Sequence, residues 1–323
     1  MTTSSPAMLR FGSFHGRLMS GRQEYTDALA LVFGVGLHQL TPEQDARRHF
    51  DLVIADSSTL VADTDASAAP LNSLTLGGTR ERPTIATDAL HAELRLDRHP
   101  VDIRLTVLRS GVPFPAMCVH FGVVIHKILF HFDRLMLHAA AVQVEDEVCL
   151  FVGDKGAGKS TTCLALARAG CTVLGEDQVV LWRSGAGYLV SGGDERSRVT
   201  ERTERHFFVE PLAVPARDFA GTMKKEIPMK DYFRSEPFRD FPPRRLLFPQ
   251  VTGRFELRRL KAQAALRRMM AYNGHFQRFE GARDQANFLD FLAGFIATVS
   301  CWELTLSDDL TELDALVEKL RNA

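Results

Sequence analysis

The stretch that decides the fold is "LFVGDKGAGKST", residues 150–161. It begins as an apolar strand, passes through a loop with three glycines and leads into the helical segment "STTCLALARAG". Residues 153–160 fit G-x-x-x-x-G-K-[ST], a pattern whose backbone N–H groups surround the phosphates of a nucleotide. Background residue usage makes a chance match in a chain of this length roughly a one-in-a-hundred event. The sequence therefore predicts a phosphate-binding loop between a strand and a helix.

Phosphate chemistry assigns a role to each part of this loop. Its glycines permit a left-handed backbone and leave room for inward-facing N–H groups. The lysine reaches the terminal phosphates, and the hydroxyl of Ser160 offers an oxygen ligand to Mg²⁺. The predicted nucleotide-binding residues are Gly153, Asp154, Lys155, Gly156, Ala157, Gly158, Lys159, Ser160 and Thr161.

Two acidic residues follow the loop helix, in "VLGEDQVVL" (173–181), which reads as the next strand. Mg²⁺ takes hard oxygen ligands, and neighbouring side chains of a strand face opposite ways. We therefore expect Asp177 to accept the proton of an attacking hydroxyl and Glu176 to serve the metal or its surroundings. The predicted metal ligands are Ser160, Glu176 and Asp177. His138 lies on a predicted strand beside the loop strand, and a lone histidine is more often a packed side chain than a functional one.

Four consecutive segments carry a family resemblance: "LHAAAV" (137–142), the loop, the short helix ending at Gly170 and "VLGEDQVVL". This part of the chain resembles the catalytic domain of HPr kinase/phosphorylase. The similarity is greater to the HPr-kinase-related proteins. The resemblance implies an α/β fold similar to phosphoenolpyruvate carboxykinase. It also implies that His138 assists catalysis, that Lys159, Glu176 and Asp177 act on phosphate, metal and acceptor, and that the γ-phosphate of ATP passes to a serine hydroxyl.

The chain departs from the authentic enzyme in three places. Thr161 stands where that enzyme has an acid, and Glu176 stands where it has Asp. A later Gly-rich signature is missing from residues 185–215. These differences indicate an acceptor other than HPr, which leaves a peptide, another protein or a small molecule.

Two domains are expected. Residues 1–112 predict a small α+β domain with a helix over 23–34, a strand over 49–56, a loop over 57–80 and two strands within 91–110. Residues 113–323 predict the P-loop (Walker A) kinase domain of the HPr kinase/phosphoenolpyruvate carboxykinase type. The apolar runs 121–132 and 291–302 are shorter than the roughly 20 residues that span a bilayer, so we expect core helices and no membrane partner.

Composition places the chain among ordinary globular proteins. It has 323 residues, 45% of them hydrophobic and 24% charged, with a net charge of −1. Its five cysteines form no C-x-x-C pair and no signal-peptide pattern opens the chain, so reduced thiols in a cytoplasmic protein are expected. Thirteen basic residues against five acidic ones in 224–268 would suit an anionic acceptor. No nucleic-acid module is recognisable, which disfavours nucleic acid as a partner.

The leading hypothesis is a phosphotransferase that uses ATP and Mg²⁺ to phosphorylate a hydroxyl of serine or a serine-like group. One alternative is a nucleotide-gated binding protein without kinase turnover. Another is a small-molecule kinase of the adenylylsulfate type, which would not account for "LHAAAV". Arg196, Arg198 and Arg202 are equivalent candidates for a phosphate clamp. A homo-oligomer is left open.

Overall fold

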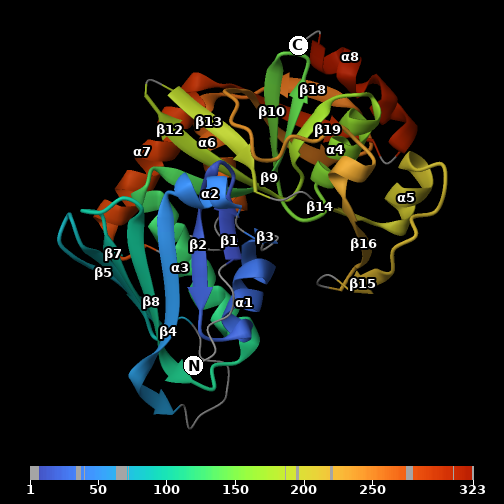
Figure 1. The fold of residues 1–323 in the computed structure, drawn as a ribbon. Coiled ribbons are helices and arrows are strands. Elements are labelled where there is room, and N and C mark those ends of the chain that lie inside the picture. Colours follow the sequence, from blue (N-terminus) through green and yellow to red (C-terminus); the bar gives the residue numbers. More distant parts are fainter. Residues whose placement is uncertain are drawn as a thin grey trace. The chain divides into compact units, whose positions relative to one another are not determined.

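The computed structural model describes residues 7–33, 38–39, 41–62, 71, 73–185, 187–193, 196–218, 221–273, 279–307 and 309–321. The chain is mixed α/β with several sheets (Figure 1). It divides into two compact units. The first comprises Met1–Leu135 and His275–Asn287, and the second comprises Met136–Gly274 and Phe288–Ala323.

The first unit is built on an eight-stranded mixed sheet with the order β3-β1-β2-β4-β8-β7-β6-β5 (Figure 1). Its β2–β4 and β4–β8 pairs are parallel, and the other pairs are antiparallel. The strands are β1 (Ala7–Phe11), β2 (Phe14–Ser20), β3 (His38–Gln39), β4 (Phe50–Ala62), β5 (Leu74–Gly78), β6 (Pro83–Thr87), β7 (Leu90–Arg95) and β8 (Val101–Ser110).

Two long helices and one short helix complete this unit: α1 (Gln23–Phe33), α2 (Pro42–Ala46) and α3 (Phe114–His131). Helices α1 and α3 pack on each other, and α3 also packs on β6 and β7. By length and composition alone α3 could cross a membrane, but 67% of it is buried. Its apolar side chains on all faces are those of a core helix, which agrees with the expectation for residues 121–132.

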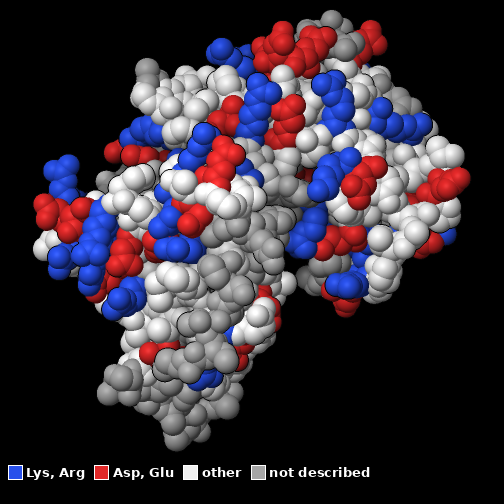
Figure 2. Space-filling view, viewed as in Figure 1, with Lys and Arg blue, Asp and Glu red and all other residues white. Residues whose placement is uncertain are grey.

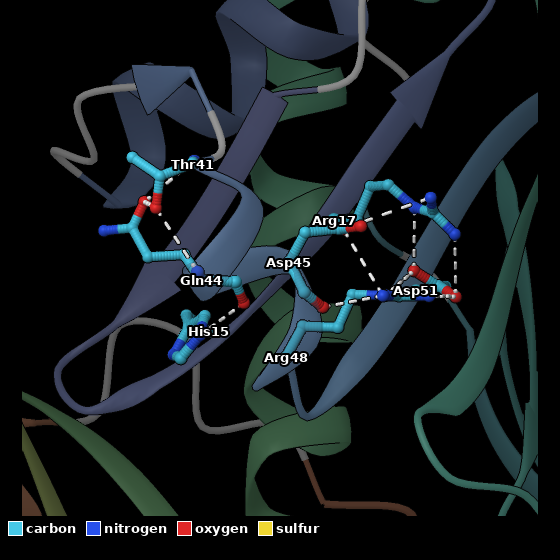
Figure 3. Close-up of polar contacts among 7 residues, drawn as sticks. All are labelled: His15, Arg17, Thr41, Gln44, Asp45, Arg48 and Asp51. Carbon is cyan, nitrogen blue, oxygen red and sulfur yellow. Dashed lines mark hydrogen bonds and ion pairs between the residues drawn. The ribbon is translucent and has the colours of Figure 1, made fainter.

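A polar network joins β2 and β4 to the turn after α2 (Figure 3). The Asp51 carboxylate accepts hydrogen bonds from Arg17 Nε at 3.0 Å and from Arg48 Nε at 2.7 Å. Arg48 also donates to the backbone oxygen of Asp45 at 2.7 Å. Each guanidinium donates two hydrogen bonds to Asp51, so the network holds the two parallel strands in register.

The structure divides the chain at a different place from the predicted boundary after residue 112. The first unit continues to Leu135 because α3 packs on α1 and on the sheet of that unit. Lys127 of α3 donates to Asp284 at 2.5 Å, which ties in the segment His275–Asn287. The loop predicted over 57–80 is wrong in part, since β4 pairs with β8 as far as Ala62 and β5 follows. Residues 63–70 and 72 lie outside the described residues.

The second unit has a mixed sheet with the order β13-β12-β9-β10-β17-β19-β18, in which β11 also pairs with β9. The pairs β10–β17 and β17–β19 are parallel. The strands of this sheet are β9 (Arg134–Val144), β10 (Glu147–Val152), β11 (Thr172–Gly175), β12 (Gln178–Ser184), β13 (Gly187–Gly192), β17 (Pro243–Val251), β18 (Glu256–Arg259) and β19 (Ser300–Leu306).

A small antiparallel sheet, β14-β16-β15, belongs to the same unit. Its strands are β14 (Arg196–Val199), β15 (Ala216–Asp218) and β16 (Met223–Pro228). The helices are α4 (Lys159–Arg168), α5 (Glu201–Phe207), α6 (Ala262–Tyr272), α7 (Ala282–Thr298) and α8 (Leu316–Arg321), with 3₁₀ turns η1 (Met229–Asp231) and η2 (Leu310–Ala315). Helix α4 is buried among β10, β11, β14 and α8 side chains, which fixes its first turn next to the small sheet.

Candidate functional site

The glycine-rich loop has the expected strand–loop–helix form. Strand β10 ends at Val152, α4 begins at Lys159, and Gly156 and Gly158 have φ angles of +84° and +97°. The positive φ favours glycine at position 158, and a Cβ there would lie 2.5 Å from Leu306 Cδ1, so that leucine would have to move. The first N–H groups of α4 have no acceptor within the helix, which leaves them able to bind an anion.

The Lys159 side chain is buried and contacts the backbone of its own loop. It is 6% exposed, and its Nζ donates to the backbone oxygens of Gly153 at 2.7 Å and Asp154 at 3.0 Å. Burial lowers the pKa of Lys159, and the charges of Asp177 and Glu176 act in the opposite direction. The ammonium is therefore held by carbonyls of its own loop and is subject to the charges of the two acids.

The sequence predicted that the two acids lie in the middle of a strand, and this prediction is wrong. They occupy a bend between β11 and β12, both of which neighbour β9. The register on β9 shifts between Val173 and Gly175, and a Cβ on Gly175 would lie 2.7 Å from the backbone oxygen of Gln178. The chain bends at this glycine. Alternation along a strand consequently does not decide where Glu176 and Asp177 point.

Glu176 is buried, at 2% exposed, directly beside the start of α4. The Ser160 hydroxyl hydrogen-bonds its carboxyl group, and its Oε1 is buried with no hydrogen-bond partner among the described residues. Burial, reinforced by the charge of Asp177, raises the pKa of Glu176 to about 7. A buried carboxylate oxygen without a partner is an expensive arrangement unless a ligand completes it.

Asp177 is held by two partners. His138 Nδ1 lies 3.1 Å from Asp177 Oδ1 and also 3.1 Å from the backbone oxygen of Asp177, and Arg198 donates to Oδ2 at 3.0 Å. Burial on its own would raise the pKa of Asp177, but the hydrogen bond from His138 and the charges of His138, Arg198 and Lys159 outweigh it, so the pKa is lowered. Two neighbouring acids thus differ in protonation because their surroundings differ.

His138 reaches this place because β9 pairs with β10, with Ala139 opposite Val152 at the start of the loop. Its backbone N–H donates to Asn273 Oδ1 at 2.9 Å. Of the three arginines that the sequence left equivalent, Arg198 contacts Asp177, whereas Arg196 pairs with Glu226 at 2.8 Å. Arg202 lines the same cavity as Arg198. Sequence reasoning missed Asn273, which nothing local marks. It could not choose Arg198, because that choice depends on where the distant Asp177 lies in the fold.

A cavity of about 380 Å³ brings most of the predicted residues together. From the predicted set it is lined by His138, Lys155, Gly156, Gly158, Lys159, Ser160, Thr161 and Asp177. Four predicted residues lie in or beside the loop but do not line the cavity: Gly153, Asp154, Ala157 and Glu176. Further lining residues include Arg198, Arg202 and Lys224, with Val251 and Leu310 forming an apolar part. A second cavity, of about 550 Å³, shares Lys224.

The donor set of this site suits Mg²⁺. Ser160, Glu176 and Asp177 offer a hydroxyl and two carboxylates, and Oε1 of Glu176 lacks a partner. Among the described residues no three His, Cys, Asp or Glu side chains are grouped closely enough to hold an ion alone. Mg²⁺ is commonly bound through one or two carboxylates together with substrate phosphates, which is the arrangement these residues allow.

Part of the basic surplus predicted over 224–268 is paired with acidic residues elsewhere in the chain. Lys225 pairs with Glu204 at 2.8 Å and Arg245 with Glu147 at 2.7 Å, while the Glu303 carboxylate accepts from two arginines. Figure 2 shows basic and acidic side chains interspersed over the visible face. These three acids lie outside residues 224–268, so they offset part of the positive charge of that segment.

Comparison with solved structures finds several similar chains. One of these, the HPr(Ser) kinase/phosphatase from Coxiella burnetii, is 13% identical over 58% of this chain and 94% of its own, with a TM-score of 0.30. A TM-score this low supports no conclusion about activity. No protein-family model matches the chain, and no curated protein matches it.

Proposed function

We propose that this chain is a phosphotransferase of the HPr-kinase-related type, which uses ATP and Mg²⁺ to phosphorylate a hydroxyl group. One observation carries the proposal. Asp177, held by His138 and Arg198, lines the same cavity as the glycine loop and Lys159. A phosphate-binding loop and an ionised carboxylate in one cavity are the two parts that transfer to a hydroxyl requires.

The residues divide the work between positioning and charge neutralisation. The loop N–H groups and Lys159 hold the phosphates, and Ser160 with Glu176 would hold the metal. Bound Mg²⁺ would neutralise charge on the phosphates. Asp177 orients the acceptor hydroxyl and takes its proton, while the hydroxyl oxygen bonds to the γ-phosphorus and the bond to the β-phosphate oxygen breaks. The products are the phosphate ester and ADP.

The surroundings of Asp177 support its assignment as the base. A lowered pKa keeps the carboxylate ionised at neutral pH, and the His138 contact fixes its orientation. The raised pKa of Glu176 has the opposite consequence, since that group is half protonated near pH 7 until a cation replaces the proton. The geometry therefore favours Asp177 over Glu176 for the proton and Glu176 for the metal.

The test has two stages. Calorimetry first measures binding of Mg-ATP to the full chain, with Lys159→Ala as the variant expected to lose it. Cell extract is then incubated with γ-labelled ATP and the protein, and the products are separated into protein and small-molecule fractions. We expect labelled acceptor in one fraction and a loss of at least about 100-fold with Lys159→Ala.

Two outcomes would replace the proposal. If ATP binds but label appears only as inorganic phosphate or stays in ATP, the chain is a nucleotide-gated binding protein. If neither Mg-ATP nor Mg-GTP binds in the calorimetry, nucleotide chemistry itself is excluded. The fraction that carries label decides between a peptide or protein acceptor and a small molecule.

A further inference from the structure

Lys224 is a basic residue of the site that the phosphate-loop pattern does not include. It stands on β16, is half-buried, and lines the same cavity as Lys159, Ser160 and Asp177. The sequence offers no local sign of its place, since Lys224 and Lys225 stand side by side in "TMKKEIP".

Strand geometry separates the two lysines. Glu226 lies opposite Arg198 in the antiparallel β14–β16 pair, and their side chains approach to 3.5 Å (Figure 1 shows the strands). Lys224 is two residues from Glu226, so it faces the same side of the strand as that pair. Lys225 faces the other side, where it donates to Glu204 at 2.8 Å and to the backbone oxygen of Leu212. Lys225 thus has a structural role, and Lys224 faces the site.

The basic groups of the site differ in what holds them. Arg198 is paired with Asp177 and Glu226, and Lys159 donates to loop carbonyls. No hydrogen bond or ion pair joins the Lys224 ammonium to another residue in the part of the chain that the structure describes. Its charge acts on both Lys159 and Glu176, although burial dominates the pKa shifts of these two residues. Lys224 therefore lies near the end of the site where the lysine of the loop and the metal acid meet.

We propose that Lys224 binds the terminal phosphate of a nucleoside triphosphate, so that the site distinguishes a triphosphate from a diphosphate. This inference rests on the proposed function, because Lys159 and the metal acid mark the terminal-phosphate end only if the loop holds a nucleotide. Lysine suits the role as a flexible point charge, and among the described residues Lys224 has no hydrogen-bond or ion-pair partner to give up on binding. After transfer of the γ-phosphate the ammonium loses its ion pair, which favours release of ADP.

Calorimetry on the full chain tests this preference for a triphosphate with two probes in the presence of Mg²⁺. The probes are ADP and a triphosphate analogue with an uncleavable β–γ bridge. We compare wild type with Lys224→Met and with Lys230→Met, a matched loss of one lysine charge at an exposed site that lines neither cavity. Lys224→Met should weaken the triphosphate analogue about tenfold and ADP less than about twofold. Lys230→Met should change neither.

Equal weakening of both probes, or no weakening, would overturn the proposal. Lys224→Arg is the control for a general disturbance of the site, because it keeps the positive charge and should keep most of the preference for the triphosphate. Loss of that preference in a folded Lys224→Arg chain would count against the proposal. Failure of wild type to bind either probe would instead refute the proposed function, so the two failures are distinguishable.

Discussion

His138 Nδ1 lies 3.1 Å from Asp177 Oδ1, and the other oxygen of that carboxylate lies 3.0 Å from Arg198. Three separate strands or bends supply these three side chains, so the arrangement exists only in the folded chain. It holds one acid ionised next to another, Glu176, whose pKa is raised to about 7.

Asp177→Asn should separate binding from transfer. The amide keeps the shape of the side chain but cannot accept the acceptor's proton, so the rate of phosphoryl transfer should fall by about 10² to 10⁴. The dissociation constant for Mg-ATP should stay the same or decrease, since a negative charge near the phosphates is removed. Labelled-phosphate assays and calorimetry on one preparation measure both. Transfer at the wild-type rate would rule out Asp177 as the base.

Arg198→Leu should move the acid limb of the pH–rate profile. Arg198 is one of the charges that lower the pKa of Asp177, so its loss lets that pKa rise and the base is protonated at higher pH. We expect the limb to shift to higher pH. Arg196→Leu is the control, because that guanidinium pairs with Glu226. A limb that stays in place in Arg198→Leu would contradict the assignment.

Glu176→Gln should change how stability depends on pH. Burial raises the pKa of Glu176 from an ordinary 4.5 to about 7, so between these values the folded chain holds a proton that the unfolded chain has lost. The free energy of unfolding of the wild type should therefore fall as pH rises through this window, by roughly 3 kcal/mol in total. The glutamine variant lacks this contribution. Urea unfolding at pH 5 to 8 in the presence of EDTA measures it.

The exposed Glu201 provides the matched control, since Glu201→Gln removes a surface carboxyl group and should leave the pH dependence of unfolding as in the wild type. Adding Mg²⁺ and nucleotide should recover stability above pH 7 in the wild type only, if Glu176 holds the cation. Parallel curves for wild type and Glu176→Gln would show that Glu176 is not the group that titrates.

Gly158→Ala and Gly156→Ala form a pair that isolates one contact. Both glycines have positive φ, so each alanine costs about 1 kcal/mol or slightly more in backbone strain. A Cβ on Gly158 also meets Leu306 at 2.5 Å, whereas one on Gly156 meets nothing within 4 Å. The Gly158 variant should therefore lose roughly 1 to 3 kcal/mol more stability in denaturant unfolding. Equal losses would show that the Leu306 contact relaxes freely.

Sequence patterns predicted the features that depend on neighbouring residues. The strand–loop–helix around 150–161 and the end of α4 near Gly170, with φ of +89°, are found in the structure. Strands β7 and β8 lie where residues 91–110 alternate. Hydrophobic period, glycine placement and a contiguous motif are local properties, so a sequence carries them directly.

Only the tertiary structure decided how distant segments meet. The bend at Glu176 and Asp177 arises because β11 and β12 both neighbour β9, and the end of the first unit depends on what α3 packs against. The register of β14 on β16 decides which of the adjacent lysines, Lys224 or Lys225, faces Arg198 and the site. Arg196 and Arg198 share one side of β14, and only the position of Asp177 in the fold separates them. Register is the alignment of two paired strands that lie far apart in the sequence. A shift by one residue would turn every side chain of a strand to the other face of the sheet.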